Sequence, residues 1–281
     1  MPTRIWHQSM TDLERLPGYK TMLAEHAVRV GNGLLQVDLH GVLPETYPPG
    51  VAPVALTRYR WAHHLVFDQF VENAVRAEIE GYDAVAISCF VDPGLELARS
   101  AVDIPVVSSC ETALLVSAAI GHSFGLITID PAMVRIVGEL VSNYGFANRV
   151  RFIESLDPPM DEFVLDQAFQ GIGPLVPSFS AQARRLIAQH DVDVVIPAEG
   201  VLNTMLVRNG IREIDGVPIL DSYGALLQMA EMMVRLRHTT GLGPSRRLCY
   251  AKPSSDLMSH LRRMTAGVLE RGARPADVPR D

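Results

Sequence analysis

The chain has 281 residues, of which 48% are hydrophobic and 20% charged, and its formal net charge is −7. This length suits two domains of ordinary size, and the hydrophobic content is sufficient to bury a core. The charges form no long acidic or basic runs, which argues against nucleic acid or an anionic membrane as a partner and favours a small-molecule substrate.

The N-terminal stretch from Met1 to His7 lacks a charged segment followed by an apolar signal core. No uninterrupted apolar run approaches the ~18 residues that a membrane helix needs. We therefore expect a cytoplasmic protein with no membrane partner.

The three cysteines, Cys89, Cys110 and Cys249, are odd in number and form no Cys-x-x-Cys pair. This pattern indicates neither a disulfide framework nor a thiolate zinc site. The histidines have no second ligand at metal spacing, so we predict no metal. At least one cysteine remains free to act as a chemical reagent.

Short runs rich in Val and Ile alternate with longer amphipathic stretches, which is typical of parallel strands joined by crossover helices. In chain order, the predicted strands cover residues 3–5, 34–39, 84–88, 106–107, 124–128, 150–153, 194–197 and 219–220. The predicted helices cover residues 62–80, 93–101, 111–120, 131–144, 181–190 and 222–239. The fold class is therefore α/β.

Three kinds of local signal refine this prediction. Asp92-Pro93 and Asp130-Pro131 each place an Asp before a Pro, which predicts an N-cap followed by the first helical residue. Residues 31–53 are rich in Gly and Pro and predict a long loop around the strand at residues 34–39, in a position to cover the cleft. Residues 270–281 have few apolar side chains to bury, so we expect disorder there.

Two stretches of the chain repeat one pattern. Residues 83–89 read Asp-Ala-Val-Ala-Ile-Ser-Cys and residues 193–199 read Asp-Val-Val-Ile-Pro-Ala-Glu, and each continues into a helical pattern and a Pro-containing strand. The repeat predicts two pseudo-symmetric domains with parallel sheets. We expect the first domain to hold residues 1–120 plus 222–281 and the second to hold residues 121–221.

In open parallel sheets, ligands bind beyond the carboxyl ends of the strands. The repeat places Cys89 and Glu199 at equivalent strand ends, so we expect them to face each other across the cleft as the catalytic pair. Other side chains that follow strands, or begin the next helix, are predicted to bind substrate: His7, Gln8, Ser9, Phe90, Ser109, Cys110, Thr128, Gly200 and Ser222. For the hydroxyls among them, helix capping is an equally good interpretation.

Each member of the pair also has a structural interpretation. Cys89 precedes the helix predicted after Asp92, whose N-terminus would favour a thiolate, yet a small buried cysteine is also common. Glu199 follows an apolar strand, where a buried carboxylate without partners is costly, but it also suits an N-cap of a helix over residues 201–209. If both face one ligand, they titrate as a coupled unit that holds one proton.

The sequence resembles the Asp/Glu/hydantoin racemase superfamily over nearly its whole length. The most specific segment is the Ser-Cys-Phe-Val-Asp-Pro-Gly-Leu string at residues 88–95, which looks most like the hydantoin racemase branch. The other segments that carry the resemblance are residues 4–9, 104–107 leading to Glu111, 124–128 and 192–200.

The resemblance implies two flavodoxin-like domains with the active site between them, no cofactor, and two cysteines acting on opposite faces of a carbon next to a carbonyl. The first cysteine carries over to Cys89, whereas Glu199 occupies the matching position of the second. The resemblance also implies that some proteins of this fold work with a single cysteine, as decarboxylases or isomerases. Proteins of this fold commonly form homo-oligomers, so we expect a homo-oligomer here.

Three functions remain open from the sequence. The first is racemisation or epimerisation of a small cyclic ureide or small carboxylate, with Cys89 and Glu199 as acid and base. The second is a hydrolase or lyase in which Cys89 is the nucleophile and Glu199 activates water, as in thiohydantoin desulfuration or decarboxylation. The third is a small-ligand-binding protein without catalysis.

Overall fold

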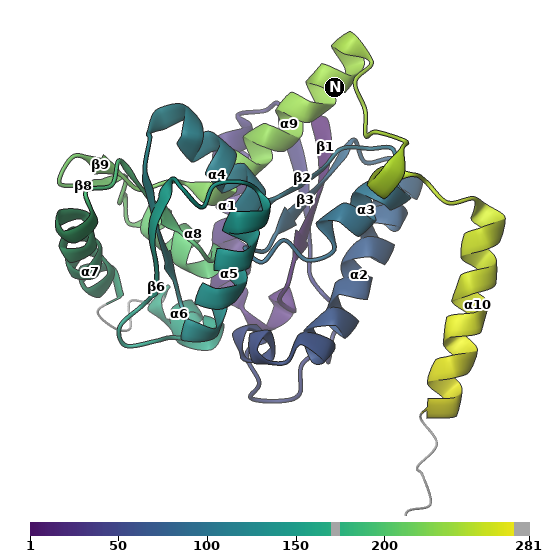
Figure 1. The fold of residues 1–281 in the computed structure, drawn as a ribbon, viewed down its shortest axis with the longest axis horizontal. Coiled ribbons are helices and arrows are strands. Elements are labelled where there is room, and N and C mark those ends of the chain that lie inside the picture. Colours follow the sequence, from purple (N-terminus) through teal and green to yellow (C-terminus); the bar gives the residue numbers. More distant parts are fainter. Residues whose placement is uncertain (170–174, 273–281) are drawn as a thin grey trace, which may run out of the picture.

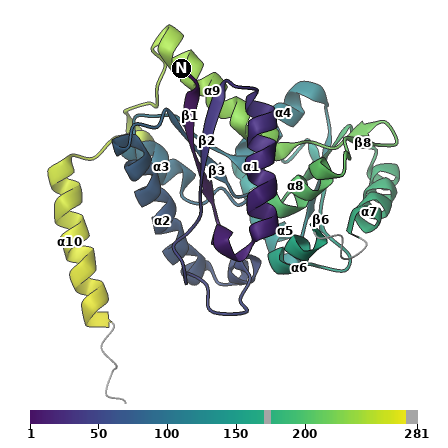
Figure 2. The ribbon, with the colours of Figure 1, turned by 180° about the vertical axis from the view of Figure 1, so that it is seen from behind.

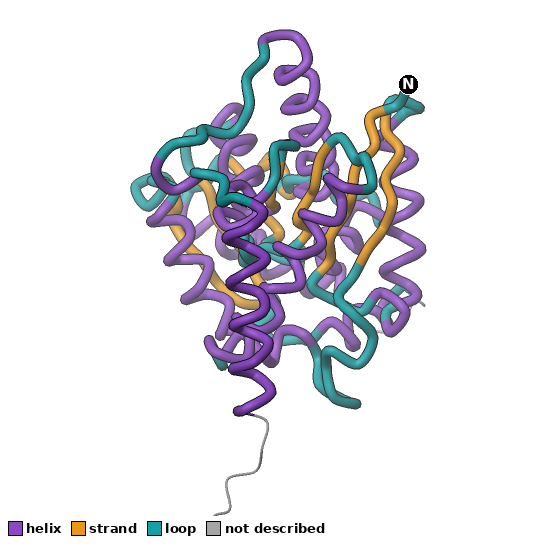
Figure 3. Tube along the Cα trace, turned by 90° about the vertical axis from the view of Figure 1, so that its right-hand side faces the viewer, coloured by secondary structure: helices purple, strands orange, loops and turns teal. Residues whose placement is uncertain are grey.

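The computed structural model describes residues 1–169 and 175–272, and it contains two parallel sheets flanked by helices on both faces (Figures 1 and 3). The first sheet has the strand order β2(Leu35–His40), β1(Thr3–Ser9), β3(Ala84–Ser88), β4(Val106–Ser108). The second has the order β6(Val150–Ser155), β5(Phe124–Thr128), β7(Val194–Pro197). All neighbouring strands within these two sheets are parallel, which confirms the predicted fold class.

The helices cover the sheets because the central strands are apolar on both faces. Every residue of β3, β5 and β7 is buried, as expected for parallel strands with helices on either side. The α-helices are α1(Pro17–Gly31), α2(Arg60–Ile79), α3(Leu95–Ala101), α4(Ser109–Ile120), α5(Pro131–Asn143), α6(Glu162–Ala168), α7(Leu175–His190), α8(Gly200–Arg208), α9(Ser222–Thr240) and α10(Ser255–Gly272). Shorter elements are the 3₁₀ turns η1(Leu13–Arg15), η2(Pro53–Arg58) and η3(Leu248–Tyr250) and the antiparallel pair β8(Glu213–Ile214) and β9(Val217–Pro218).

The two sheets repeat one topology. In each, the first strand of the half is central, the second lies on one side, and the third lies on the other. In the second sheet, a single parallel bridge between Val195 and Ile219 lies where the first sheet has its fourth strand, β4. The sequence predicts a strand there, at residues 219–220. The repeat therefore places Cys89, after β3, and Glu199, after β7, at equivalent positions.

Several elements differ from the predicted ones. The sequence does not predict α1, α6 or α10, and α7 begins at Leu175 rather than at residue 181. Strand β1 extends to Ser9 because its polar residues His7 and Gln8 are fully buried within the sheet, which their composition does not indicate. The disorder expected from residue 270 does not hold for residues 270–272, since α10 continues to Gly272; the rest of that segment lies outside the described residues.

The predicted N-cap at Asp130 is confirmed, whereas the one at Asp92 is wrong. The Asp130 carboxylate accepts a hydrogen bond from the backbone N–H of Ala132 in the first turn of α5. Helix α3 starts only at Leu95, after Gly94, and Asp92 caps a different helix. Its carboxylate accepts hydrogen bonds from the backbone N–H groups of Cys110 (2.8 Å) and Glu111 (2.9 Å) at the start of α4.

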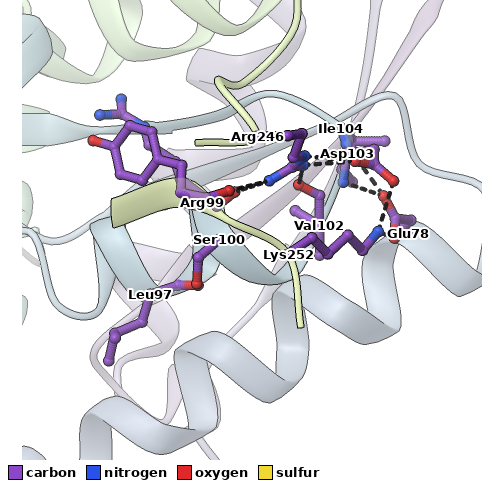
Figure 4. A network of polar contacts seen from close by, with 10 residues as sticks. Glu78, Leu97, Arg99, Ser100, Val102, Asp103, Ile104, Arg246 and Lys252 are labelled. Atoms are coloured by element: carbon purple, nitrogen blue, oxygen red, sulfur yellow. Dashed lines mark hydrogen bonds and ion pairs between the residues drawn. The ribbon is translucent and has the colours of Figure 1, made fainter. Parts of the chain in front are cut away.

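The C-terminal part of the chain returns to the first sheet. Helix α9 packs against β3, α4 and α1. Beyond it, Arg246 and Lys252 both bond to Asp103, at 2.6 Å each, and so tie the following segment to the end of α3 (Figure 4). Helix α10 then runs along the outside of the body (Figure 2). The exact domain boundaries remain a prediction.

None of the described helices is long and apolar enough to cross a membrane.

Candidate active site

A pocket with an empty volume of about 480 Å³ lies where the carboxyl ends of β1, β3 and β7 meet. It receives residues from both halves of the chain, so the expected cleft between the two halves is present. Its lining consists of Ser9, Met10, Thr11, Tyr19, Pro53, Val54, Thr57, His63, Ser88, Cys89, Phe90, Val91, Met133, Glu162, Glu199 and Gly200. Five of the predicted site residues are among them: Ser9, Cys89, Phe90, Glu199 and Gly200.

Cys89 lies half-buried directly after β3. Desolvation raises the pKa of its thiol well above the usual range, and the carboxylates of Asp92, Glu199 and Glu162 add to this effect, while a hydrogen bond from the Val91 backbone opposes it. The expected stabilisation of a thiolate by a helix N-terminus is therefore wrong, because α3 begins only at Leu95. At neutral pH, Cys89 is a thiol and can act as an acid.

Glu199 lies directly before α8, where its side chain both caps that helix and lines the pocket. Its Oε2 accepts a hydrogen bond from the backbone N–H of Leu202 at 2.7 Å, which makes it the N-cap of α8, and the same side chain lines the pocket. Burial raises the pKa of its carboxyl, although N–H groups of the first turn of α8 act in the opposite direction.

Gly200 is required by a close approach from the first half of the chain. A Cβ at this position would lie 2.5 Å from the hydroxyl oxygen of Tyr19 on α1. That distance is too short for any side chain to fit without moving Tyr19. The glycine thus allows the Tyr19 phenol to contact the loop that carries Glu199.

A second carboxyl group in the pocket, Glu162, is not predicted from the sequence. It is the first residue of α6, is only 6% exposed, and accepts a hydrogen bond from the backbone N–H of Val54 at 3.2 Å. Burial and the nearby Glu199 raise the pKa of Glu162 to about 8. Two carboxyl groups and a thiol therefore share one small pocket.

The pocket contains no counter-charge for these groups among the residues that the structure describes. Neither lysine nor arginine belongs to its lining. His63, on α2, lines the pocket, but burial lowers its pKa to about 4, so its imidazole is neutral at physiological pH. An anionic ligand would thus meet carboxyl groups without a cation to offset them.

Three hydroxyls predicted to bind substrate lie outside the pocket. Ser109 donates to the backbone oxygen of Ile87 at 3.2 Å, and Thr128 donates to the backbone oxygen of Asp130 at 3.2 Å. Ser222 is buried at the start of α9. The N-caps of α4, α5 and α9 are Ser108, Asp130 and Asp221, so the alternative interpretation of these three hydroxyls as helix caps is also wrong.

The other predicted residues outside the pocket belong to the interior. Cys110 and His7 are both fully buried, and the His7 ring packs edge-on against Tyr223 at a centroid distance of 5.6 Å. Gln8 accepts hydrogen bonds from the side chains of Trp6 (3.0 Å) and Asn73 (2.9 Å). Proximity to a strand end does not decide whether a side chain points into the cleft or into the core.

Some lining residues that sequence reasoning missed lie at or just after the ends of β1 and β3, and the others lie on helices and on the segment after β2. Tyr19 comes from α1, His63 from α2 and Glu162 from α6, while Val54 and Thr57 come from η2. The predicted loop over residues 31–53 is adjacent to η2, and Pro53 is the only predicted loop residue in the described lining. An Asp-Glu pair such as residues 161–162 reads as an ordinary helix start, so nothing in the sequence singles out Glu162.

The raised pKa of Glu162 predicts a specific dependence of stability on pH. The native state keeps the proton up to about pH 8, whereas the unfolded chain releases it near its ordinary value of 4.5. The native state therefore binds more protons between these values, and its free energy of unfolding falls as pH rises, by up to ~1.4 kcal/mol per pH unit. Denaturant unfolding should show that Glu162→Gln gains stability relative to the wild type across this window. A constant difference between the two would contradict the prediction.

The fold is thus two repeated α/β halves, with a thiol and a carboxyl group at equivalent strand ends beside one pocket. A sequence model described as Asp/Glu/hydantoin racemase matches residues 36–230. The chain therefore belongs to the Asp/Glu/hydantoin racemase family, which confirms the resemblance noted from its motifs.

Individual relatives agree with this assignment. The chain is 29% identical over 172 residues to the hydantoin racemase of Rhizobium meliloti, covering 59% of this chain and 66% of the relative. It is 26% identical over 227 residues to the hydantoin racemase of Paenarthrobacter aurescens, covering 80% and 91%. Its fold is similar to that of allantoin racemase from Klebsiella pneumoniae, with a TM-score of 0.74, 20% identity, and coverage of 90% and 94%.

Proposed function

We propose that this protein is a cofactor-independent racemase or epimerase that moves a proton at a carbon next to a carbonyl of a small cyclic ureide. The observation that carries the proposal is the presence of Cys89 and Glu199 at equivalent strand ends of the two halves, lining one pocket. Relatives whose names specify hydantoin and allantoin support a cyclic ureide as the substrate.

The electrostatics of the pair suit a two-base reaction. The Cys89 thiol holds its proton at neutral pH, while the ordinary pKa of a carboxyl leaves Glu199 the easier of the two to ionise. Glu199 removes the proton from one face of the ring carbon, and Cys89 returns a proton on the opposite face. In the reverse direction the roles exchange. The pair holds one proton before and after the reaction and two protons while the substrate carbon is deprotonated.

The charge of the pocket favours a neutral substrate over a carboxylate. Glu162 and Glu199 are the acidic groups of the described lining, and no cationic side chain accompanies them there. A small carboxylate would add a third acidic group to a partly desolvated space, which is costly. A cyclic ureide brings no net charge and offers both N–H donors and carbonyl acceptors.

The nucleophilic alternative is less well supported. Attack on a carbonyl or thiocarbonyl carbon requires the thiolate of Cys89, and the surroundings of this residue disfavour that form. A hydrolase or lyase would need substrate binding to lower the pKa of the thiol first. We therefore place proton transfer ahead of Cys-dependent hydrolysis or decarboxylation.

One experiment separates these reactions. The protein is incubated in D2O with one enantiomer of a 5-substituted hydantoin, or with its 2-thio analogue. NMR follows deuteration at the ring carbon, circular dichroism follows loss of optical activity, and a colorimetric assay follows sulfide. Deuteration with racemisation and without sulfide is the expected result. Sulfide release without deuteration would instead establish Cys89 as a nucleophile, and binding without either change would indicate a non-catalytic protein.

A further inference from the structure

Glu162 has no role in the proton transfer between Cys89 and Glu199, although it lines the same pocket. It lies at the start of α6 with 6% of its surface exposed. Its Oε2 accepts the backbone N–H of Val54, which belongs to η2. No hydrogen bond reaches its other carboxyl oxygen from the residues that the structure describes, so this oxygen is free to contact a ligand in the pocket.

The groups around Glu162 are acidic or neutral on each element that packs near it. Glu199 comes from the loop after β7, Cys89 from the end of β3, and His63 from α2. Tyr47 comes from the segment after β2 and Asp161 from the position before α6, and both interact electrostatically with Glu162. Arg15, whose side chain stacks over the ring of the adjacent Phe163, donates to the backbone oxygen of Tyr47.

These surroundings determine the form of the Glu162 carboxyl. An ionised carboxylate at this depth would need a cation or several donors, and the backbone N–H groups of Glu162 itself and of Val54 are outweighed by burial and by the neighbouring carboxyl of Glu199. The neutral carboxylic acid avoids this penalty. It also converts the free oxygen into an O–H group, which is a hydrogen-bond donor.

We propose that Glu162 is a further catalytic residue, whose carboxylic acid donates a hydrogen bond to the substrate carbonyl oxygen as negative charge develops on it. This inference rests on the proposed function. When the base removes the proton from the ring carbon, the electron pair of the broken C–H bond moves onto the adjacent carbonyl to form an enolate. The O–H of Glu162 stabilises that oxygen and keeps its own proton, and the charge returns to carbon when the second proton arrives.

A hydrogen-bond donor beside the substrate carbonyl would stabilise the enolate oxygen. The hydroxyls of Ser109 and Thr128, which the sequence predicts to bind substrate, lie outside the pocket and donate to backbone oxygens. The Thr57 hydroxyl, which does line the pocket, donates to the backbone oxygen of Val54 at 2.6 Å. Preorganised donors aimed at a developing oxyanion are among the largest contributions to catalysis.

The test compares two substitutions of Glu162 in the exchange assay. Glu162→Met removes the donor and should lower kcat about 100-fold, while Glu162→Gln keeps an N–H donor and should lower it about 10-fold, with KM nearly unchanged in both. In the wild type, kcat should decline above pH 8, where Glu162 loses its proton. That decline should be missing in Glu162→Gln. Glu213→Gln, at an exposed position in β8, is the matched control and should behave as the wild type.

The outcomes separate this inference from the proposed function. Unchanged kcat in Glu162→Met, or the same alkaline decline in Glu162→Gln as in the wild type, overturns the role of Glu162 while leaving the racemase intact. If the wild type exchanges deuterium into neither hydantoin, the proposed function fails. The pH dependence of hydantoin binding then tests the role of Glu162. Affinity that falls above pH 8 in the wild type but not in Glu162→Gln retains the donor role, whereas pH-independent or absent binding removes it.

Discussion

Replacement of Cys89 by alanine is expected to abolish racemisation, with a loss of about 10³-fold or more in kcat. The thiol is the group that holds the proton on one side of the pocket, and alanine offers neither an acid nor a base there. Because Cys89 is partly buried and small, the substitution should leave the fold intact. Circular dichroism of a hydantoin enantiomer measures racemisation directly. Cys249→Ala is the matched control, since that thiol is exposed and far along the chain in η3.

The complementary variant, Glu199→Gln, should separate exchange from racemisation. With Cys89 still present, the small fraction of thiolate at alkaline pH can deprotonate one enantiomer and return a proton to the same face, so deuterium should slowly enter that enantiomer without loss of optical activity. Cys89→Ala should show the same behaviour with the opposite enantiomer. Glutamine can still cap α8 through its side-chain oxygen, which limits the stability cost to about 1 kcal/mol. Full racemisation by either variant would show that the two residues do not form the two-base pair.

The sequence predicts the fold well because the repeated pattern consists of apolar strands. The runs before Cys89 and Glu199 are short, rich in Val and Ile, and fully buried in the structure. Their position in the sequence therefore indicates directly where the strands lie. The same spacing locates the two strand ends that meet at the pocket. Elements whose identity depends on distant packing, such as α1 and α6, give no comparable signal and are missed.

The rest of the pocket could not be predicted for a related reason. Glu162 reaches the pocket because α6 packs against α8 and α1, and Val54 of η2 contacts it across 108 positions of sequence. Neither contact produces a recognisable pattern in the neighbouring sequence. Conversely, Ser109 and Thr128 satisfy the rule for strand ends but use their hydroxyls on nearby backbone oxygens. The rule identifies the correct edge of the sheet without specifying the direction of each side chain.

Replacement of Asp92 by alanine is expected to lower the free energy of unfolding by about 3–5 kcal/mol. Its carboxylate is 6% exposed and accepts four hydrogen bonds: two from the backbone at the start of α4, one from Ser108 (2.6 Å) and one from Tyr144 (2.8 Å). Alanine leaves these donors without a partner in the interior, and each buried unpaired donor is costly. Urea unfolding near neutral pH measures the loss.

The other Asp-Pro pair of the chain supplies the control for this prediction. Asp130 caps its own helix with one backbone hydrogen bond and pairs with the exposed Arg58 at 3.0 Å. Asp130→Ala should therefore cost only about 1 kcal/mol. Equal losses for the two variants would mean that the carboxylate of Asp92 does no more than an ordinary cap. A larger loss at Asp92 would show that the loop after Cys89 is held by α4 and by Tyr144 of the second half, which fixes the thiol relative to Glu199.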